Sequence, residues 1–247
     1  EISSANYVAR KFGVSAGMSL RRALQLCPDL TTLPFEFDKY SEFGERVYHE
    51  LFQLTPHVEG VSCDEAFLDV THLISSLEAA PNETRALAEK LKAAVLRHTQ
   101  GRLTLTVGAG PSRVVARVAT KSAKPNGFRY VGPGEETAAF LASLPVSRLP
   151  GCGHSTTAKL QSDFSVETVA EMLQIPKSEL QRVFGPKVGA NLHALCRGVD
   201  TAPWQPRPPR KTVSAQSSYG VRVASRTEAS EFLRELAKRV SERLDKL

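Results

Sequence analysis

Apolar residues recur with helical spacing along several stretches of the chain. Between Tyr40 and Leu54, and again between Glu83 and His98, they return every three or four residues, which predicts two amphipathic helices. A shorter helix is predicted over 20–26. From Leu103 to Val107 apolar residues alternate with threonines, the pattern of a half-buried strand. With a strand-like run over 58–70 between the two long helices, these elements predict an α/β layer.

The strand-like run contains two adjacent carboxylates. Asp64 and Glu65 are poor strand formers with apolar residues on both sides, so they predict a tight hairpin turn from whose tip both side chains project. Burying ionised carboxylates between two buried strands is costly unless a cation receives them, and a divalent metal is the natural partner. An acidic surface turn is the alternative, which the apolar flanks make less favourable.

The second half of the chain has a different pattern. Short helices and tight turns are predicted from Gly134 to about Thr201, typical of a small helical domain. Residues 202–211 contain four prolines and no apolar periodicity, which indicates an extended basic linker. A strand over 213–223 and an amphipathic helix after a capping-box signature at Ser225 should follow. One strand and one helix cannot bury themselves, so we expect the last domain, and both chain ends, to continue in a longer protein.

The distribution of charge along the chain is more informative about function than the net charge. The formal net charge is +6 and the pI about 9.2, which fits a polyanionic partner. Residues 90–134 contain nine Lys or Arg and no Asp or Glu, whereas residues 59–69 contain four acids and no Lys or Arg. Such segregation indicates a site for metal and phosphate. The four cysteines lie far apart, without zinc-ligand spacing, and predict reduced, mostly buried thiols. No apolar run approaches the length of a membrane span.

The basic residues that follow Ser112 form a helical stripe. Arg113, Arg117, Lys121 and Lys124 are spaced by four, four and three residues, opposite an apolar face of valines. The functional interpretation is phosphate contact, with Lys124 best placed for a specific ligand because it ends the helix before a turn. A solvated basic face is the alternative.

Glycines mark a turn over 149–160 that resembles a helix-hairpin-helix motif. Gly151 and Gly153 would let the turn approach a DNA backbone, and the exposed amides around Ser155 at the next helix start could bind a phosphate. A Gly-x-Gly sequence is also common in ordinary loops, which is the alternative.

Near the start of the chain, Tyr7 and Arg10 are three residues apart and can face one ligand from a single helical turn. Ser4 and Asn6 could cap that turn. A lone Tyr and Arg would be ordinary surface residues. Together with Asp64, Glu65 and Lys124 they would supply what a metal-bound triphosphate requires.

In combination these motifs resemble the Y-family (UmuC-type) translesion DNA polymerases, over essentially the whole chain. The resemblance lies in four segments: Asn6-Tyr7-Val8-Ala9-Arg10, Ser62-Cys63-Asp64-Glu65-Ala66, Ala123-Lys124-Pro125-Asn126-Gly127 and Leu149-Pro150-Gly151-Cys152-Gly153. Further segments, among them Lys211-Thr212-Val213-Ser214-Ala215, are most similar to the deoxycytidyl transferase branch, the Rev-type DNA repair proteins of eukaryotes.

The resemblance implies an α+β, multidomain, right-hand polymerase fold. Its parts would be fingers over 1–36, a palm over 37–130, a helical thumb over 131–204, a linker over 205–211 and a truncated little finger over 212–247.

It also implies roles for the candidate residues. Asp64 and Glu65 would be catalytic and hold the magnesium ions, two in the full-length enzyme. The incoming nucleotide would be contacted by Ser4, Asn6, Tyr7, Arg10 and Lys124. DNA would be contacted by Arg113, Arg117, Lys121, Gly151, Gly153 and Ser155.

The implied activity is insertion of dCMP, from dCTP, opposite abasic sites and damaged guanine in primer–template DNA. We expect a nuclear protein that meets other translesion polymerases through regions outside this chain and binds no membrane. The family's first catalytic aspartate and the segment that selects dCTP are expected upstream of Glu1, so the 247-residue chain alone should be inactive. The alternatives are a non-catalytic DNA-binding scaffold and a metal-dependent nuclease.

Overall fold

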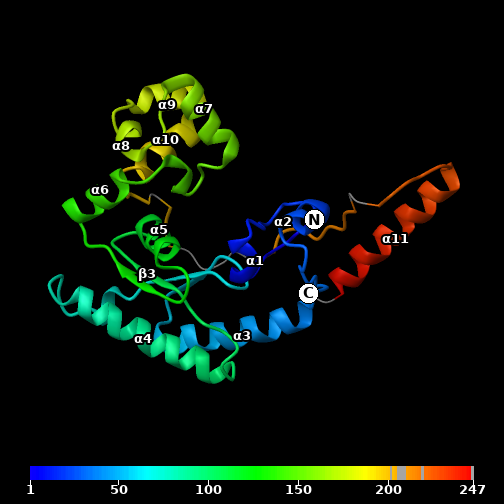
Figure 1. The fold of residues 1–247 in the computed structure, drawn as a ribbon, viewed down its shortest axis with the longest axis horizontal. Coiled ribbons are helices and arrows are strands. Elements are labelled where there is room, and N and C mark those ends of the chain that lie inside the picture. The colour runs from blue at the N-terminus through cyan, green and yellow to red at the C-terminus, as the bar shows by residue number, and fades with distance from the viewer. Residues whose placement is uncertain (201, 205–209, 218–219, 246–247) are drawn as a thin grey trace. The chain divides into compact units, whose positions relative to one another are not determined.

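A computed structural model describes residues 1–200, 202–204, 210–217 and 220–245 of the chain (Figure 1). The structure divides into two units, residues 1–48 and residues 49–247, and each is described by itself. The division falls inside helix α3 (Phe37–Leu54), which begins slightly before the predicted Tyr40.

The first unit is built on two short capped helices. Asn6 accepts a hydrogen bond from the Ala9 N–H at the start of α1 (Tyr7–Lys11), and Ser19 caps α2 (Leu20–Leu26) in the same way. The predicted helix over 20–26 is therefore confirmed. Ala9, Val14 and Ala23 form a small core, against which neighbouring apolar residues pack.

The second unit contains the predicted hairpin. Strand β1 (Val58–Gly60) pairs antiparallel with β2 (Ala66–Leu68), with Gly60 opposite Ala66, and a 3-10 turn η1 (Thr71–Leu73) follows. The expectation of two buried strands is wrong, because both strands are half-buried and Asp64 and Glu65 are exposed at the tip. In the part of the chain that is described, this sheet has only two strands, so neither is enclosed by neighbours on both edges.

A strand-helix-strand unit forms the centre of the second unit. Strand β3 (Val107–Ala109) pairs parallel with β4 (Phe128–Tyr130), and α5 (Arg113–Ala123) connects them. Helix α4 (Ala80–His98) lies on the other side of this sheet from α5 (Figure 1). The predicted strand over 103–107 is thus displaced toward the C-terminus: hydrogen bonds form only where β4 runs alongside, and the alternating residues before Val107 have no strand partner in the described chain.

Gly108 explains how closely α5 approaches β3. A Cβ atom at this position would lie 2.2 Å from the Thr120 nitrogen and 2.4 Å from the Ala116 oxygen, both in the α5 backbone. Only a residue without a side chain allows this packing.

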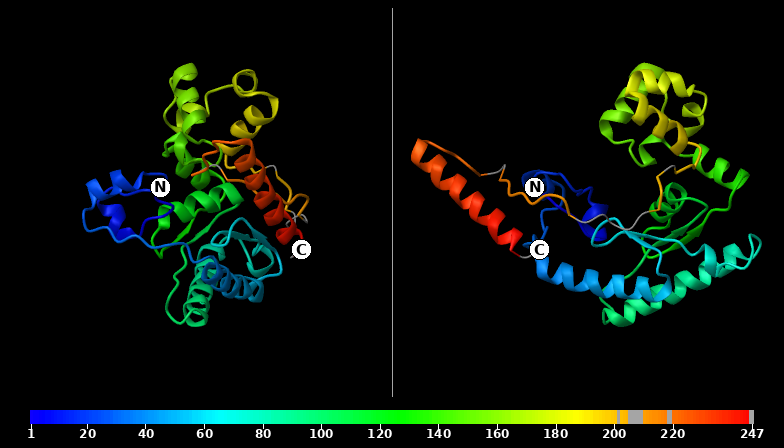
Figure 2. Two further views of the ribbon diagram at one scale, coloured as in Figure 1. Left: turned by 90° about the vertical axis from the view of Figure 1, so that its right-hand side faces the viewer. Right: turned by 180° about the vertical axis from the view of Figure 1, so that it is seen from behind.

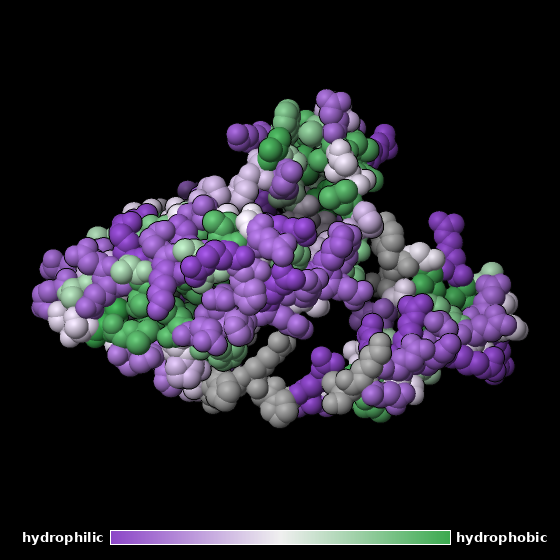
Figure 3. All heavy atoms as spheres, turned by 90° about the horizontal axis from the view of Figure 1, so that it is seen from below, coloured by the Kyte–Doolittle hydropathy of each residue, from purple (hydrophilic) through white to green (hydrophobic). Residues whose placement is uncertain are grey.

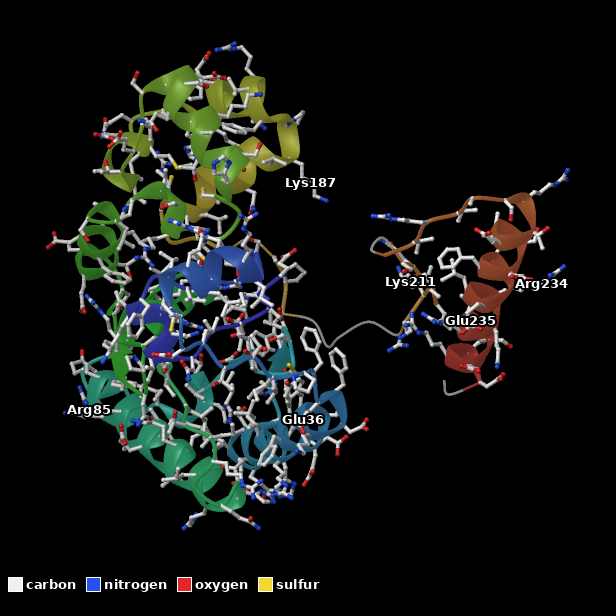
Figure 4. All side chains as sticks on the ribbon, turned by 45° about the vertical axis from the view of Figure 1, so that its right-hand side comes forward. Glu36, Arg85, Lys187, Lys211, Arg234 and Glu235 are labelled. Atoms are coloured by element: carbon white, nitrogen blue, oxygen red, sulfur yellow. The ribbon has the colours of Figure 1, made fainter. Side chains whose placement is uncertain are left out.

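Short helices follow, as predicted: α6 (Glu135–Ala142), η2 (Val146–Arg148), α7 (His154–Phe164), α8 (Val169–Met172), α9 (Lys177–Phe184) and α10 (Pro186–Leu195), seen from two sides in Figure 2. Their buried side chains, among them Leu160, Met172 and Leu180, form one continuous core with Val115 and Val118 of α5. Lys187, in the first turn of α10, points away from this core into solvent (Figure 4).

The C-terminal segment contains helix α11 (Arg226–Leu244). Ser225 caps it by accepting the Glu228 N–H, while the Glu228 carboxylate accepts the N–H of Ala224 rather than that of Ser225. The predicted strand over 213–223 is wrong for the described residues, which form no strand because no neighbouring strand offers them hydrogen bonds. Apolar side chains of this segment, such as Leu233 and Val223, are exposed. Figure 3 shows apolar surface on this segment, at the right of the view. Most of the proline-rich linker, residues 205–209, lies outside the described residues.

Within the described residues, no helix combines the length and apolar character needed to cross a bilayer. The four cysteines are free thiols: Cys152 and Cys196 are buried, Cys27 is half-buried and Cys63 is exposed.

Candidate active site

Ser62 organises the tip of the β1–β2 hairpin. Its Oγ accepts hydrogen bonds from the backbone N–H groups of Asp64 (3.3 Å) and Glu65 (3.1 Å) and donates one to the Asp64 carboxylate. The Glu65 carbonyl closes the loop by accepting the N–H groups of Val61 and Ser62. One hydroxyl therefore sets the conformation of both acidic residues, a local pattern typical of serine in turns.

Helix α5 presents its basic side chains toward this hairpin. Arg117 Nη2 lies 3.2 Å from Glu65 Oε2, and both side chains are substantially exposed. A single exposed contact of this kind contributes at most about 1 kcal/mol, so a metal ion could displace it. The buried Arg117 Nε has no hydrogen-bond partner in the described chain, which leaves the guanidinium incompletely satisfied.

Arg113, one turn earlier, is fully engaged elsewhere. Its Nη1 donates to Glu59 (2.6 Å) and its Nε to Asp200 (2.7 Å), while Nη2 donates to the carbonyl of Ala202. Burial opposes its charge, but hydrogen bonds and attraction from Asp200 and Glu59 prevail and raise its pKa. The side chain is only 15% exposed. These contacts favour a structural role, joining α5 to β1 and to the end of the short-helix region, over DNA contact.

Lys121 lies in a cationic neighbourhood. Burial lowers its pKa, and the positive charges of Arg117, Arg148 and Lys124 lower it further, although Glu65 acts in the opposite direction. We define the cationic row as Arg117, Lys121, Lys124 and Arg148. Because these side chains repel one another, an anion bound among them would relieve the repulsion.

Lys124 is the C-terminal cap of α5, at the helix end as its sequence position predicted, and its backbone is extended. It is exposed, and the following turn is held by the Asn126 N–H, which donates to Thr106 Oγ1 (2.9 Å). The second unit therefore brings Asp64 and Glu65 together with Arg117, and places Lys121 and Lys124 along the same helix.

The glycine turn before α7 has the geometry that its sequence predicted. Gly151 has φ +82°, the left-handed region, and Gly153 is the N-terminal cap of α7. Gly151, Gly153 and Ser155 are exposed, while Cys152 between the glycines is buried, and burial together with nearby Cys196 raises its pKa to about 11. Cys152 thus anchors a turn that leads into exposed first residues of α7, whose N–H groups lack intrahelical acceptors.

The candidate nucleotide-contact residues near the N-terminus belong to the first unit. The Arg10 guanidinium stacks over the Tyr7 ring, 5.0 Å from its centroid, and Arg10 Nε donates to the Ala5 carbonyl (2.8 Å). Asn6 uses its side chain as the α1 cap, and Ser4 is exposed. Tyr7 and Arg10 do share one helical face, as their spacing predicted.

Sequence reasoning missed three features of the site. Ser62 was part of the motif but had no role assigned, although a serine two residues before an Asp is a recognisable turn signal. The partners Glu59 and Asp200 of Arg113 could not be found from local sequence, because Asp200 is 87 residues away. Arg148 joins the cationic row through tertiary structure alone.

The fold is that of a right-hand polymerase, and comparisons with known proteins specify the class. The impB/mucB/samB family matches residues 1–121, and the thumb domain of DNA polymerase iota matches residues 147–200. A solved structure, a Y-family DNA polymerase chimera of Dbh and Dpo4, aligns with a TM-score of 0.81 at 26% identity, covering 97% of this chain and 67% of that one.

Curated relatives lead to the same family. DNA repair protein REV1 of Arabidopsis thaliana is 37% identical across 99% of this chain and 22% of its own length. DNA polymerase IV of Ralstonia nicotianae is 35% identical across 99% of this chain and 66% of its own length. The chain belongs to the Y-family, UmuC-type, of DNA polymerases. It spans 22 to 26% of the length of the Rev1 relatives that it matches.

Proposed function

We propose that the chain is the part of a translesion DNA polymerase that holds the catalytic metal with Asp64 and Glu65. The observation that carries this proposal is the hairpin tip, where Ser62 binds the backbone of both exposed acidic residues and Arg117 lies next to the Glu65 carboxylate. Carboxylate oxygens are the ligands that Mg²⁺ prefers, and both are accessible to it. No third acidic, His or Cys ligand atom lies with this pair among the described residues, so the two residues supply part of a coordination sphere.

The chain's own residues would divide the remaining work. Lys124, with Tyr7, Arg10 and Ser4 of the first unit, would bind the triphosphate oxygens, since these side chains are donors or cations. Arg117 and Lys121 would contact the DNA backbone with their positive charges, and the turn from Gly151 to Ser155 would contact it through its N–H groups. Bound magnesium would supply stabilisation of the attacking and leaving oxygens in phosphoryl transfer.

The proposed domain assignment follows that division of labour. Fingers would comprise residues 1–36, the palm 37–130 and the thumb 131–204, with a linker over 205–211 and little-finger sequence from 212 onward. The continuous core from α5 into the short helices supports a firm palm–thumb connection.

We further propose that the full-length protein is a deoxycytidyl transferase that inserts dCMP opposite abasic sites and damaged guanine. Rev1 relatives that match nearly the whole chain support this branch, although polymerase IV relatives are similarly identical. Because the Rev1 relatives are DNA repair proteins of eukaryotes, we place the protein in the nucleus.

The test is primer extension by the full-length protein with each dNTP separately, on templates carrying guanine or an abasic site. The Asp64→Asn/Glu65→Gln variant should lose transfer on the order of 10⁴-fold while it keeps its affinity for DNA. The deoxycytidyl transferase proposal requires dCTP to be used in preference to the other three nucleotides on both templates.

The competing scaffold function predicts a different result. If the carboxylates have no catalytic role, the double variant should transfer nucleotides as well as the parent protein, or neither should transfer any. The Glu135→Gln/Glu136→Gln variant is a matched control, because these carboxylates begin α6 and lie outside the proposed site.

A further inference from the structure

Two histidines and a glutamate meet where α3 and α4 approach each other near their C-terminal ends. His49 and Glu50 are consecutive residues of α3, and His98 is the last residue of α4. Each offers one nitrogen or oxygen ligand atom, and these three atoms lie within 4.8 Å of one another. Among the described residues this is the one group of three metal-binding side chains that close together.

The contacts inside the group are close. His98 Nδ1 lies 2.7 Å from Glu50 Oε1, and the rings of His49 and His98 meet edge to face with centroids 5.3 Å apart. An ion pair with a protonated His98, plus a ring contact, would explain each contact separately. Neither contact explains why the His49 imidazole lies beside His98 and Glu50, which already pair with each other.

We propose that His49, Glu50 and His98 bind a transition-metal ion of the Zn²⁺ type. Two imidazoles and one carboxylate form a known ligand set for zinc, with water at the fourth position. Nitrogen ligands disfavour Mg²⁺, so this site would differ in metal preference from the Asp64–Glu65 hairpin.

The surroundings are compatible with a cation. The carbonyl groups at the C-terminal end of α4 carry partial negative charge beside His98, and Glu50 adds a full one. Arg46, one helical turn before Glu50, has its guanidinium paired with Glu42. The exposed rings of His49 and His98 can reorient to shorten the ligand separations. The bound ion would join the C-terminal half of α3 to the end of α4, so metal binding should stabilise the fold.

The experiment is calorimetric titration of the chain with Zn²⁺ in excess Mg²⁺, which keeps the hairpin carboxylates occupied. A Cys63→Ser background removes the exposed thiol, a competing zinc ligand. We expect one equivalent of zinc to bind, held by three side chains. The dissociation constant should be at least ~10-fold higher for His49→Ala/His98→Ala, because losing even a group that only hydrogen-bonds to a metal ligand weakens metal affinity by that factor. Zinc should also raise the Tm of the parent chain but not that of His49→Ala/His98→Ala.

His57 and His72 provide the matched control. They also meet edge to face, with ring centroids 5.5 Å apart, but are not part of the three-ligand group. His57→Ala/His72→Ala should bind zinc as the parent does. Glu50→Gln keeps the size of the side chain but should weaken binding, which separates loss of a ligand from loss of folding. Equal zinc affinity in the parent and His49→Ala/His98→Ala, or no saturable site in the parent, would overturn the proposal.

Discussion

The single hydroxyl of Ser62 binds the backbone N–H groups of both acidic site residues and the Asp64 carboxylate. Ser62→Ala should lower nucleotide transfer by the full-length protein about 10-fold, because losing hydrogen bonds worth ~1 to 1.5 kcal/mol frees the Asp64–Glu65 segment. The positioning role predicts a higher Mg²⁺ requirement, measured as the concentration giving half-maximal primer extension. Ser62→Thr keeps the hydroxyl and should restore most of the rate. Ser143→Ala, which removes a hydroxyl bonded to the Phe140 carbonyl in α6, is the control and should change neither quantity.

Arg113 differs from Arg117 although both lie on the same basic stripe. Arg113→Gln should lower the free energy of unfolding by about 2 kcal/mol, since Glu59 and Asp200 would keep mostly buried carboxylates without their cation. Arg117→Gln removes one exposed contact and should change stability by less than ~1 kcal/mol. Urea denaturation of the two variants measures both values. If Arg113→Gln is as stable as the parent protein but binds DNA more weakly, Arg113 is a DNA contact after all.

The packing of α5 on β3 depends on a position without a side chain. Gly108→Ala would place a methyl group against the α5 backbone and should destabilise the protein by ~1 to 3 kcal/mol through overpacking. Gly153→Ala is the matched control, because a Cβ there meets nothing within 4 Å and its φ of −72° suits any residue. Thermal unfolding should separate the two variants clearly. A Gly108→Ala protein as stable as the parent would contradict the described approach of the helix to the strand.

Helices were predictable from sequence where their signals are local. The apolar periodicity of α3 and α4 and the serine caps of α2, α5 and α11 all lie within a few residues of the structures they specify. Strands were less predictable, because a strand requires hydrogen bonds from a second segment. The hairpin was predicted correctly because β2 follows β1 closely in the sequence. Residues 213–223 have residue types that favour strands, but they have no partner strand in the described chain.

Candidate-site residues show the same limit. Residue type identified Asp64 and Glu65, and helical spacing identified Lys124. The burial expected around the carboxylates was wrong, since exposure depends on which segments cover a hairpin. The pairing of Arg113 with Asp200 and the approach of Arg148 to Lys121 arise only when distant parts of the chain fold together. Spacing on a helix can therefore identify a basic stripe, but the division of that stripe into structural and ligand-facing cations requires the tertiary structure.

At the scale of the whole molecule, the proposed DNA contacts can be separated from the effect of net charge. Replacing the proposed DNA contacts Arg117 and Lys121, together with the neighbouring Lys124, by Gln lowers the formal net charge from +6 to +3. If each contacts a phosphate, the slope of log affinity for duplex DNA against log salt should become shallower by about 2 to 3. Fluorescence anisotropy at several salt concentrations measures this slope. The matched control replaces Lys39, Lys92 and Lys238, exposed or partly exposed lysines each paired with a glutamate, by Gln.

Both triple variants have the same formal charge, so a long-range field acting without specific contacts would weaken binding equally in each. Contact through α5 instead predicts a large loss of slope in the first variant and a small one in the second.

Because Lys121 already has a pKa lowered by burial and by its cationic neighbours, DNA that binds there should raise this pKa, and the complex should take up protons. As the pH rises toward the lowered pKa of free Lys121, affinity should therefore fall in the parent protein. Lys121→Gln should remove that dependence, and a pH dependence unchanged in this variant would assign the proton to another group.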